Sequence, residues 1–225
     1  SKKNTIDPEQ MISLYGADSV RLFILSDSPP EKDVQWSDMG MVSAHKFIQK
    51  LFSLHEKIKF IQKTEQVEKS SELAKFINQY LFKIEKNLSS FHYNVIIANI
   101  HEAYTFFSQI IKNQLNYSNL LDEYSKFLIS ISPIIPHLSS ECLSQININN
   151  YSWPTIEKNY LEEKNIEIVV QFNGKKRGTI NTKKDILENE LVEEIIMKKT
   201  FEKFMKGNKF KKCFYVKNRL INFLI

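Results

Sequence analysis

The sequence has 225 residues, of which 42% are hydrophobic and 25% charged, and its formal net charge is +5. This length and composition exclude a collagen-like or largely disordered chain and leave room for two compact domains. No apolar run reaches the roughly 20 residues that cross a bilayer, so we expect no membrane segment.

The first residues carry strong helix-boundary signals. Asp7 and Pro8 have the spacing of an N-cap and a first-turn proline, with Gln10 as the capping-box partner. Gly16 predicts the end of that helix. Because neither an initiator Met nor an apolar leader precedes these signals, Ser1 predicts a cut within a longer protein.

A second helix is predicted from Ala17 to Leu25, before the helix-ending run Ser28-Pro29-Pro30. Its inward residues should be Val20, Phe23 and Ile24. The stretch 31–38 predicts a loop that carries Trp36, and Ser37 or Asp38 should cap the next helix.

The middle of the chain repeats the helical period in five apolar-striped segments. The third of them is apolar on most sides, which predicts a helix buried between neighbours. Five such helices in succession predict an antiparallel bundle. The predicted segments are 37–61, 71–88, 94–115, 120–131 and 136–146, and their expected buried residues include Phe47, Phe52, Phe76, Leu88, Val95 and Cys142.

A different architecture is predicted after an amide-rich linker that starts at Asn147. Alternating apolar residues in 166–172, followed by Asn173-Gly174, indicate a β-hairpin whose return strand covers 175–180. A helix is expected over 185–199, and Phe201 to Met205 should extend it or form another turn before Gly207. Two β-rich runs, 210–216 and 220–225, complete a β-β-α-β-β unit.

The predicted fold class is therefore mainly α. A short helical segment (1–42) precedes an antiparallel helical bundle (43–150), and a linker (151–164) leads to a small α+β C-terminal domain (165–225).

Catalytic and metal motifs are not found in the sequence. It has five glycines and no phosphate-cradling loop, and its histidines and two cysteines do not share the short spacings of zinc sites. We therefore expect no metal and no cofactor in this chain, with free cysteines in a reducing compartment.

Positive charge is concentrated at the C-terminal end. Residues 165–225 contain 14 Lys/Arg against 7 Asp/Glu, whereas the remainder is slightly acidic. Such a cluster attracts a polyanion, most naturally nucleic-acid phosphates. The alternative is a merely soluble lysine-rich surface. The candidate tRNA-binding residues are Lys175, Lys176, Arg177, Lys211, Lys212, Lys217 and Arg219.

The opening stretch SKKNTIDPEQMISLYGADSVRLFILSDSPPEKDVQWSD resembles bacterial leucyl-tRNA synthetases where their chains leave the KMSKS loop. Ser1 matches the last letter of that signature, and Lys3 departs from it because the family has glycine there. Similar segments continue along the chain. They are 91–100 (F-N-T-A-I-A), 133–141 (P-x-x-P-H-x-x-E-E), Trp153-Pro154, 168–178 (VVQVNGKLRG) and 216–222 (VPNRLVN).

The resemblance implies a parent enzyme, leucine-tRNA ligase, that activates leucine with ATP and magnesium and transfers it to its tRNA. This chain would hold the stem-contact segment, a bundle of the class I anticodon-binding type and a tRNA-binding C-terminal domain. Ser1 would be the trailing residue of the ATP loop, so the fragment alone should be inactive. For Arg21 and Trp36 we expect structural roles. The expected partner is leucine tRNA, and the parent should be a cytoplasmic monomer.

Two alternatives remain. A freestanding tRNA-binding or scaffolding protein would lack KMSK residues immediately upstream of Ser1. A valyl or isoleucyl enzyme fragment would end in a charged heptad helix or a cysteine-rich zinc segment, and neither pattern occurs in this sequence.

Overall fold

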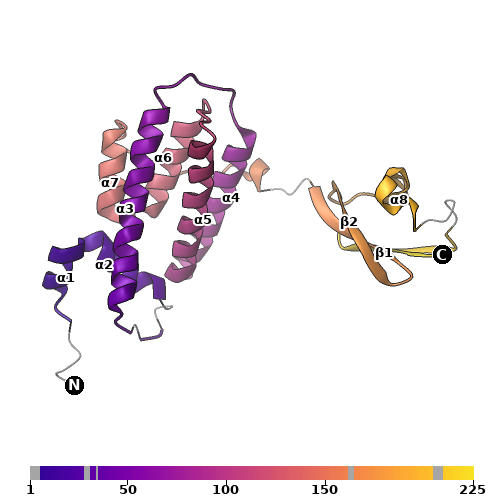
Figure 1. Cartoon of the computed structure of the whole chain (residues 1–225), viewed down its shortest axis with the longest axis horizontal. Coiled ribbons are helices and arrows are strands. Elements are labelled where there is room, and N and C mark those ends of the chain that lie inside the picture. The colour runs from indigo at the N-terminus through magenta and orange to yellow at the C-terminus, as the bar shows by residue number, and fades with distance from the viewer. Residues whose placement is uncertain (1–5, 28–30, 34, 162–164, 205–209) are drawn as a thin grey trace. The chain divides into compact units, whose positions relative to one another are not determined.

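The computed structural model describes residues 6–27, 31–33, 35–161, 165–204 and 210–225. The chain divides into two compact units, 1–161 and 162–225. The first is helical, and the second combines a four-stranded sheet with two short helices (Figure 1). The predicted fold class, mainly α with a small α+β part at the C-terminal end, is confirmed.

The first unit opens with two helices, α1 (Pro8–Tyr15) and α2 (Ala17–Asp27). The Asp7 carboxylate caps α1 by accepting from the Glu9 amide at 3.0 Å. Gly16 ends α1 at φ +82° and donates its amide to the Ile12 carbonyl. Both predicted boundaries are confirmed, whereas the Ser28-Pro29-Pro30 run lies outside the described residues.

The predicted inward face of α2 is partly wrong. Phe23 is buried, but Ile24 is 47% exposed, and Leu22 is buried in its place. The buried stripe also includes Asp18 and Ser19, four residues before Leu22 and Phe23. Because these two residues are polar, hydropathy alone does not reveal that the stripe passes through them.

Five further helices form the bundle, and in Figure 1 α3 to α6 lie side by side. Ser37 caps α3 by accepting from the Gly40 amide, and Ser70 caps α4 in the same way. Of the apolar residues expected inside, Phe52 is 39% and Val95 42% exposed. The helices are α3 (Asp38–Ile61), α4 (Ser71–Ser89), α5 (Tyr93–Lys112), α6 (Leu120–Ile131) and α7 (Pro136–Gln145).

Helix α5 is the central member, as its apolar pattern predicts, because it packs against α2, α3 and α4. Its Phe107 ring also lies 5.2 Å from the Tyr124 ring and 5.5 Å from the Phe127 ring, both on α6. Aromatic pairs at such separations add stabilisation beyond the apolar area that they bury. The bundle core is thus centred on the α5–α6 contact.

The corner between α6 and α7 is held by α2. The Arg21 guanidinium donates to the carbonyls of Ile134 and Pro133, at 3.0 and 2.7 Å. The buried Asp18 carboxylate accepts from the amides of His137 and Leu138, at 3.3 and 2.7 Å. We call these contacts the α2 latch. It satisfies carbonyls after α6 and amides in the first turn of α7, groups that have no partner within their own helices.

Residues after α7 return to α4. The Trp153 indole donates to the Glu85 carboxylate at 2.9 Å, and the Glu157 amide donates to the buried Asn78 side chain at 2.7 Å. A short 3-10 turn, η1 (Lys158–Tyr160), follows and also contacts α4. Part of the segment expected to be a linker is therefore attached to the bundle; the domain limits drawn from the sequence stay predictions.

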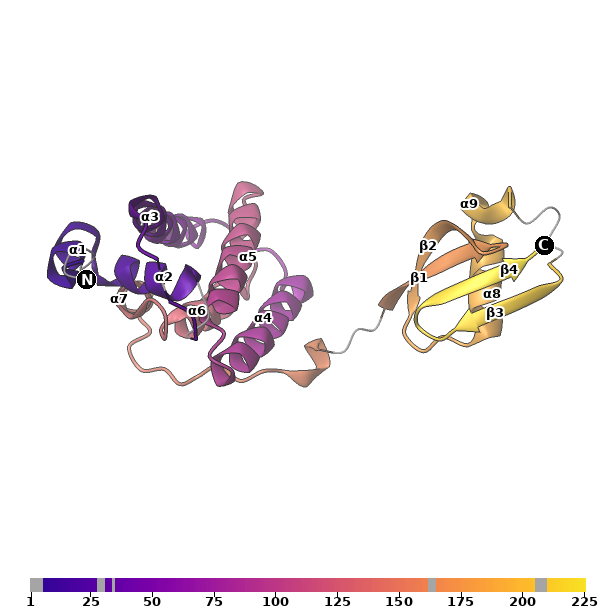
Figure 2. The same cartoon turned by 90° about the horizontal axis from the view of Figure 1, so that it is seen from below.

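The second unit has the strand order β2-β1-β4-β3. Strand β1 pairs antiparallel with β2 and parallel with β4, and β3 pairs antiparallel with β4. Figure 2 shows α8 along one side of this sheet. The elements are β1 (Asn165–Phe172), β2 (Lys175–Lys183), α8 (Glu188–Met197), α9 (Lys199–Glu202), β3 (Lys212–Val216) and β4 (Leu220–Leu224).

The hairpin turn is confirmed, since Asn173 and Gly174 both have positive φ, 50° and 75°. The helix expected from Asp185 instead begins at Glu188. Asp185 has a φ of +63°, which a helix cannot accommodate, and Leu187 is extended as the residue before the helix. The expected strop at Gly207 lies outside the described residues.

A histidine buried in the bundle gives the first unit a predicted pH dependence. His55 is buried, its Nδ1 lies 3.3 Å from the Tyr124 hydroxyl, and its Nε2 has no hydrogen-bond partner. Burial, and then the nearby Lys59 ammonium, lower the pKa of His55 below 6.5. Burial and Lys50 lower the pKa of His101 in the same way.

The native state therefore resists protonation that the unfolded chain accepts. We expect the urea midpoint of the first unit to be constant above pH 7 and to fall below about pH 6.5, by at most about 1.4 kcal/mol per pH unit for each proton. The variant His55→Leu should lose part of this dependence, and His101→Gln another part. An identical profile in both variants and the parent chain would contradict the assignment.

Candidate functional site

Five of the seven predicted basic residues lie at one end of the sheet, which we call the hairpin end. Strands β1 and β4 are parallel, so both finish there, while the antiparallel β2 and β3 begin there. The hairpin turn is tied to β4 at this end, since the Gly174 amide donates to the Asn222 side chain at 3.0 Å. The five residues are Lys175, Lys176, Arg177, Lys211 and Lys212, and all are exposed.

Arg177 differs from the other four in its surroundings. The register of β1 and β2 shifts between Val170 and Gln171, which pair with Gly178 and Lys176, so Arg177 is the extra residue of a β-bulge. Its guanidinium carbon lies 5.0 Å from the centre of the Phe204 ring. This cation–π contact orients Arg177 toward the helix-covered side of the unit.

Lys217 and Arg219 lie at the opposite end of the sheet, in the turn between β3 and β4. The Lys217 ammonium is 2.9 Å from the Asp185 carboxylate, and the Asn218 side chain donates to the same group at 3.0 Å. These hydrogen bonds lower the pKa of Asp185. The structure therefore separates the predicted residues into two groups, and one member of the smaller group is already paired with an acid.

Apolar residues on the open face of the sheet are a feature that the sequence reading missed. Side chains facing α8 are buried, including Ile168, Val170 and Ile221, and their alternates face away from the helix. On this open face Phe214 is 45% exposed, and the Lys212 ammonium lies 4.8 Å from its ring centre. The alternation within 212–216 carried the signal, but it does not reveal that a helix covers only one face.

At the N-terminal end, Ser1 lies outside the described residues. Arg21 belongs to the α2 latch, and Trp36 packs edge-to-face on Phe23 with its indole donating to Asp38 at 2.7 Å. Both side chains thus have the structural roles that the sequence predicts, although Arg21 is exposed rather than buried.

Metal and membrane sites were searched in the same described ranges. No group of three or more His, Cys, Asp or Glu residues there could hold a metal ion. Nor does any helix of those ranges have the length and apolar character needed to cross a membrane. Burial raises the pKa of the Cys142 thiol to about 12 and that of Cys213 to about 11, so neither thiol is activated.

Residues 70–192, more than half of the chain, match the family described as "Anticodon-binding domain of tRNA ligase". Similar curated proteins are the leucine–tRNA ligases of Thermosipho melanesiensis, 31% identical, and Orientia tsutsugamushi, 34% identical. Both matches cover 100% of this chain but only 29% and 27% of the relatives' lengths.

A solved structure extends the likeness to the fold. It is a ternary complex of LeuRS, tRNA and LeuAMS from Agrobacterium radiobacter, matched over 98% of this chain and 30% of that one, with a TM-score of 0.77 at 21% identity. The family match, which runs from the start of α4 into α8, agrees with the bundle and hairpin described above. The chain therefore belongs to the family of anticodon-binding domains of tRNA ligases.

Proposed function

We propose that this chain is the tRNA-binding part of a leucine–tRNA ligase and that its second unit binds leucine tRNA through backbone phosphates. The observation that carries the proposal is the gathering of five cationic side chains at the hairpin end of one small sheet. Lysine and arginine clusters bind nucleic acids by releasing counterions from phosphates, independently of base sequence. Leucine–tRNA ligases among the relatives support the choice of tRNA.

The open face adds a second kind of contact to this proposal. Phe214, with the Lys212 ammonium above its ring, lies at the same edge strand as part of the basic group. An exposed aromatic ring stacks on nucleobases without reading their identity. The hairpin end therefore supplies charge, and the open face supplies an apolar surface beside it.

Activation of leucine with ATP and magnesium is assigned to the parent enzyme and not to this chain. The support is the sequence resemblance, in which Ser1 alone represents the KMSKS loop. A monomeric state and a cytoplasmic location stay predictions. Sequencing the reading frame upstream of Ser1 distinguishes this proposal from a freestanding tRNA-binding protein, because only a ligase would encode KMSK there.

The phosphate contacts are tested by titrating the whole chain with leucine tRNA at several salt concentrations. In the variant Lys175→Ala/Lys176→Ala the slope of log affinity against log salt should flatten by about 0.7 to 0.9 for each lost contact. An unrelated tRNA should show the same change, because phosphates carry no sequence information. Adding Arg177→Ala should flatten the slope again.

The matched control is Lys183→Ala/Lys184→Ala, which removes two adjacent lysines from the other end of the same strand. It lowers the net charge equally, so it should change only the long-range attraction and leave most of the slope intact. Equal flattening in both double variants would show that tRNA meets the unit's general charge, and the assignment to the hairpin end would fail.

A further inference from the structure

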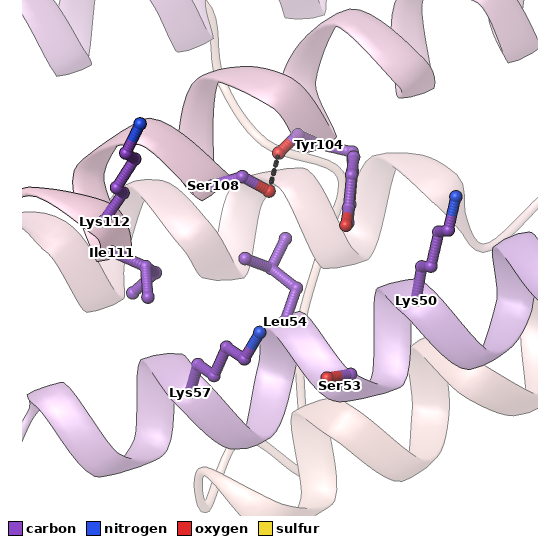
Figure 3. A pocket seen from close by; sticks show the side chains of 8 residues that line it. All are labelled: Lys50, Ser53, Leu54, Lys57, Tyr104, Ser108, Ile111 and Lys112. Atoms are coloured by element: carbon purple, nitrogen blue, oxygen red, sulfur yellow. Dashed lines mark hydrogen bonds between the residues drawn. The ribbon is translucent and has the colours of Figure 1, made fainter.

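A groove between α3 and α5 is the strongest unassigned feature of the first unit (Figure 3). Two adjoining cavities of about 280 and 520 Å³ form it, and both are lined by Ser53, Lys57 and Ile111. Buried Leu54 lies at its floor. In Figure 3 the Tyr104 hydroxyl points from α5 toward α3. We call this feature the α3–α5 groove.

The charge around the smaller cavity has one sign. Lys50, Lys57 and Lys112 line it, and no carboxylate does. None of the three lysines forms an ion pair with another described residue. Glu56 lines only the larger cavity, and its carboxylate is bound by Lys59 at 2.9 Å. The groove thus presents uncompensated positive charge over an apolar floor.

Helix dipoles explain only part of this lysine set. Lys112 lies in the last turn of α5, where a cation interacts favourably with the helix C-terminus. Lys50 lies in the interior of α3 and Lys57 a further two turns along, about 10 Å along the helix axis. Lys50 also helps to lower the pKa of His101, so its charge acts on this side of the bundle.

An exposed aromatic side chain completes the groove. Phe60 lines the larger cavity and is 72% exposed, next to the buried Ile61. A simply solvated lysine face has no need for an exposed phenylalanine beside an apolar floor. Proteins that hold single-stranded nucleic acid combine cations along the backbone with aromatic rings on which bases stack.

We propose that the α3–α5 groove binds a single-stranded segment of RNA, with phosphates at Lys50 and Lys57 and one unpaired base against Phe60. Charge complementarity selects this occupant: an uninterrupted cationic wall fits a phosphodiester chain, and the apolar end fits a base. RNA as the partner follows from the proposed function. The groove nevertheless uses side chains of the first unit only, so the two proposals can fail separately.

The experiment titrates the whole chain with a fluorescent 12-nucleotide single-stranded RNA of mixed sequence. Lys50→Ala/Lys57→Ala should weaken binding and flatten the salt slope by about 0.7 for each lost contact. Phe60→Ala should weaken binding about fivefold or more with an unchanged slope, because stacking releases no counterions. All these side chains are exposed, so circular dichroism should show intact folding.

Matched controls come from α4. Lys75→Ala/Lys86→Ala removes two exposed lysines, and Phe82→Ala removes a phenylalanine that is 50% exposed. Both should bind the oligonucleotide like the parent chain.

Unchanged oligonucleotide binding in the groove variants overturns the inference, while the tRNA slope of Lys175→Ala/Lys176→Ala still decides the proposed function. Competition by oligoglutamate that depends on Lys50 and Lys57 and matches RNA in affinity also overturns it, because the groove would then accept any acidic chain.

Discussion

Replacing Asp18 by alanine should lower the free energy of unfolding of the first unit by about 2 to 4 kcal/mol. The loss of a side-chain cap at the start of α7 costs about 1 kcal/mol, and each buried amide left without a partner costs about 1 to 3 kcal/mol. Asp18 is only 7% exposed, so water replaces its carboxylate poorly. Both tryptophans lie in this unit, and urea unfolding followed by tryptophan fluorescence therefore measures it selectively.

The matched control for this latch is His137→Ala. The His137 ring also binds the Asp18 carboxylate, at 2.9 Å, but its side chain is 75% exposed. An exposed ion pair contributes about 1 kcal/mol or less, and the backbone amides of α7 keep their partner in this variant. Equal destabilisation by the two substitutions would show that the ring contact, rather than the capping of α7, supplies the stability.

Phe223→Ala should unfold a large fraction of the second unit. Phe223 is fully buried, and its ring lies 5.2 Å from that of Phe172 and 5.1 Å from that of Phe210. Truncation of a core phenylalanine costs about 3 to 5 kcal/mol, which approaches the whole stability of a domain of this size. Because the unit has no tryptophan, hydrogen exchange of β1 and β2 is the appropriate measurement, and affinity for leucine tRNA should fall with it.

Phe214→Ala provides the comparison within the same sheet. Its ring is exposed on the open face, so the substitution should cost about 1 kcal/mol or less and leave exchange in β1 and β2 unchanged. Any loss of tRNA affinity in this variant would then reflect a contact rather than unfolding. Full protection of β1 and β2 in Phe223→Ala would contradict the packing described for this unit.

Local signals account for most of what could be predicted from the sequence. Asp7, Ser37 and Asn173-Gly174 act on backbone groups within a few residues of themselves, and the structure confirms each of them. The period of 3.6 residues located the bundle helices to within a few residues. The limits of such patterns show at Ile24, because polar Asp18 and Ser19 lie on the buried face of α2.

Contacts between distant segments could not be predicted in the same way. The parallel pairing of β1 with β4, which decides that Lys176 and Lys212 lie at one end of the sheet while Lys217 lies at the other, leaves no local signature. The α3–α5 groove likewise depends on how two helices pack. Composition located the basic unit, but only the topology groups its side chains.

The α2 latch also has a kinetic consequence for the first unit. Its hydrogen bonds join residues 112 to 120 positions apart. Closing a loop of that length costs about 4 kcal/mol of chain entropy, whereas helical turns and neighbouring helix pairs form at much lower cost. We therefore expect the latch to form after the folding transition state. Its removal should accelerate unfolding and leave the folding rate almost unchanged, so that Asp18 determines how long the bundle persists.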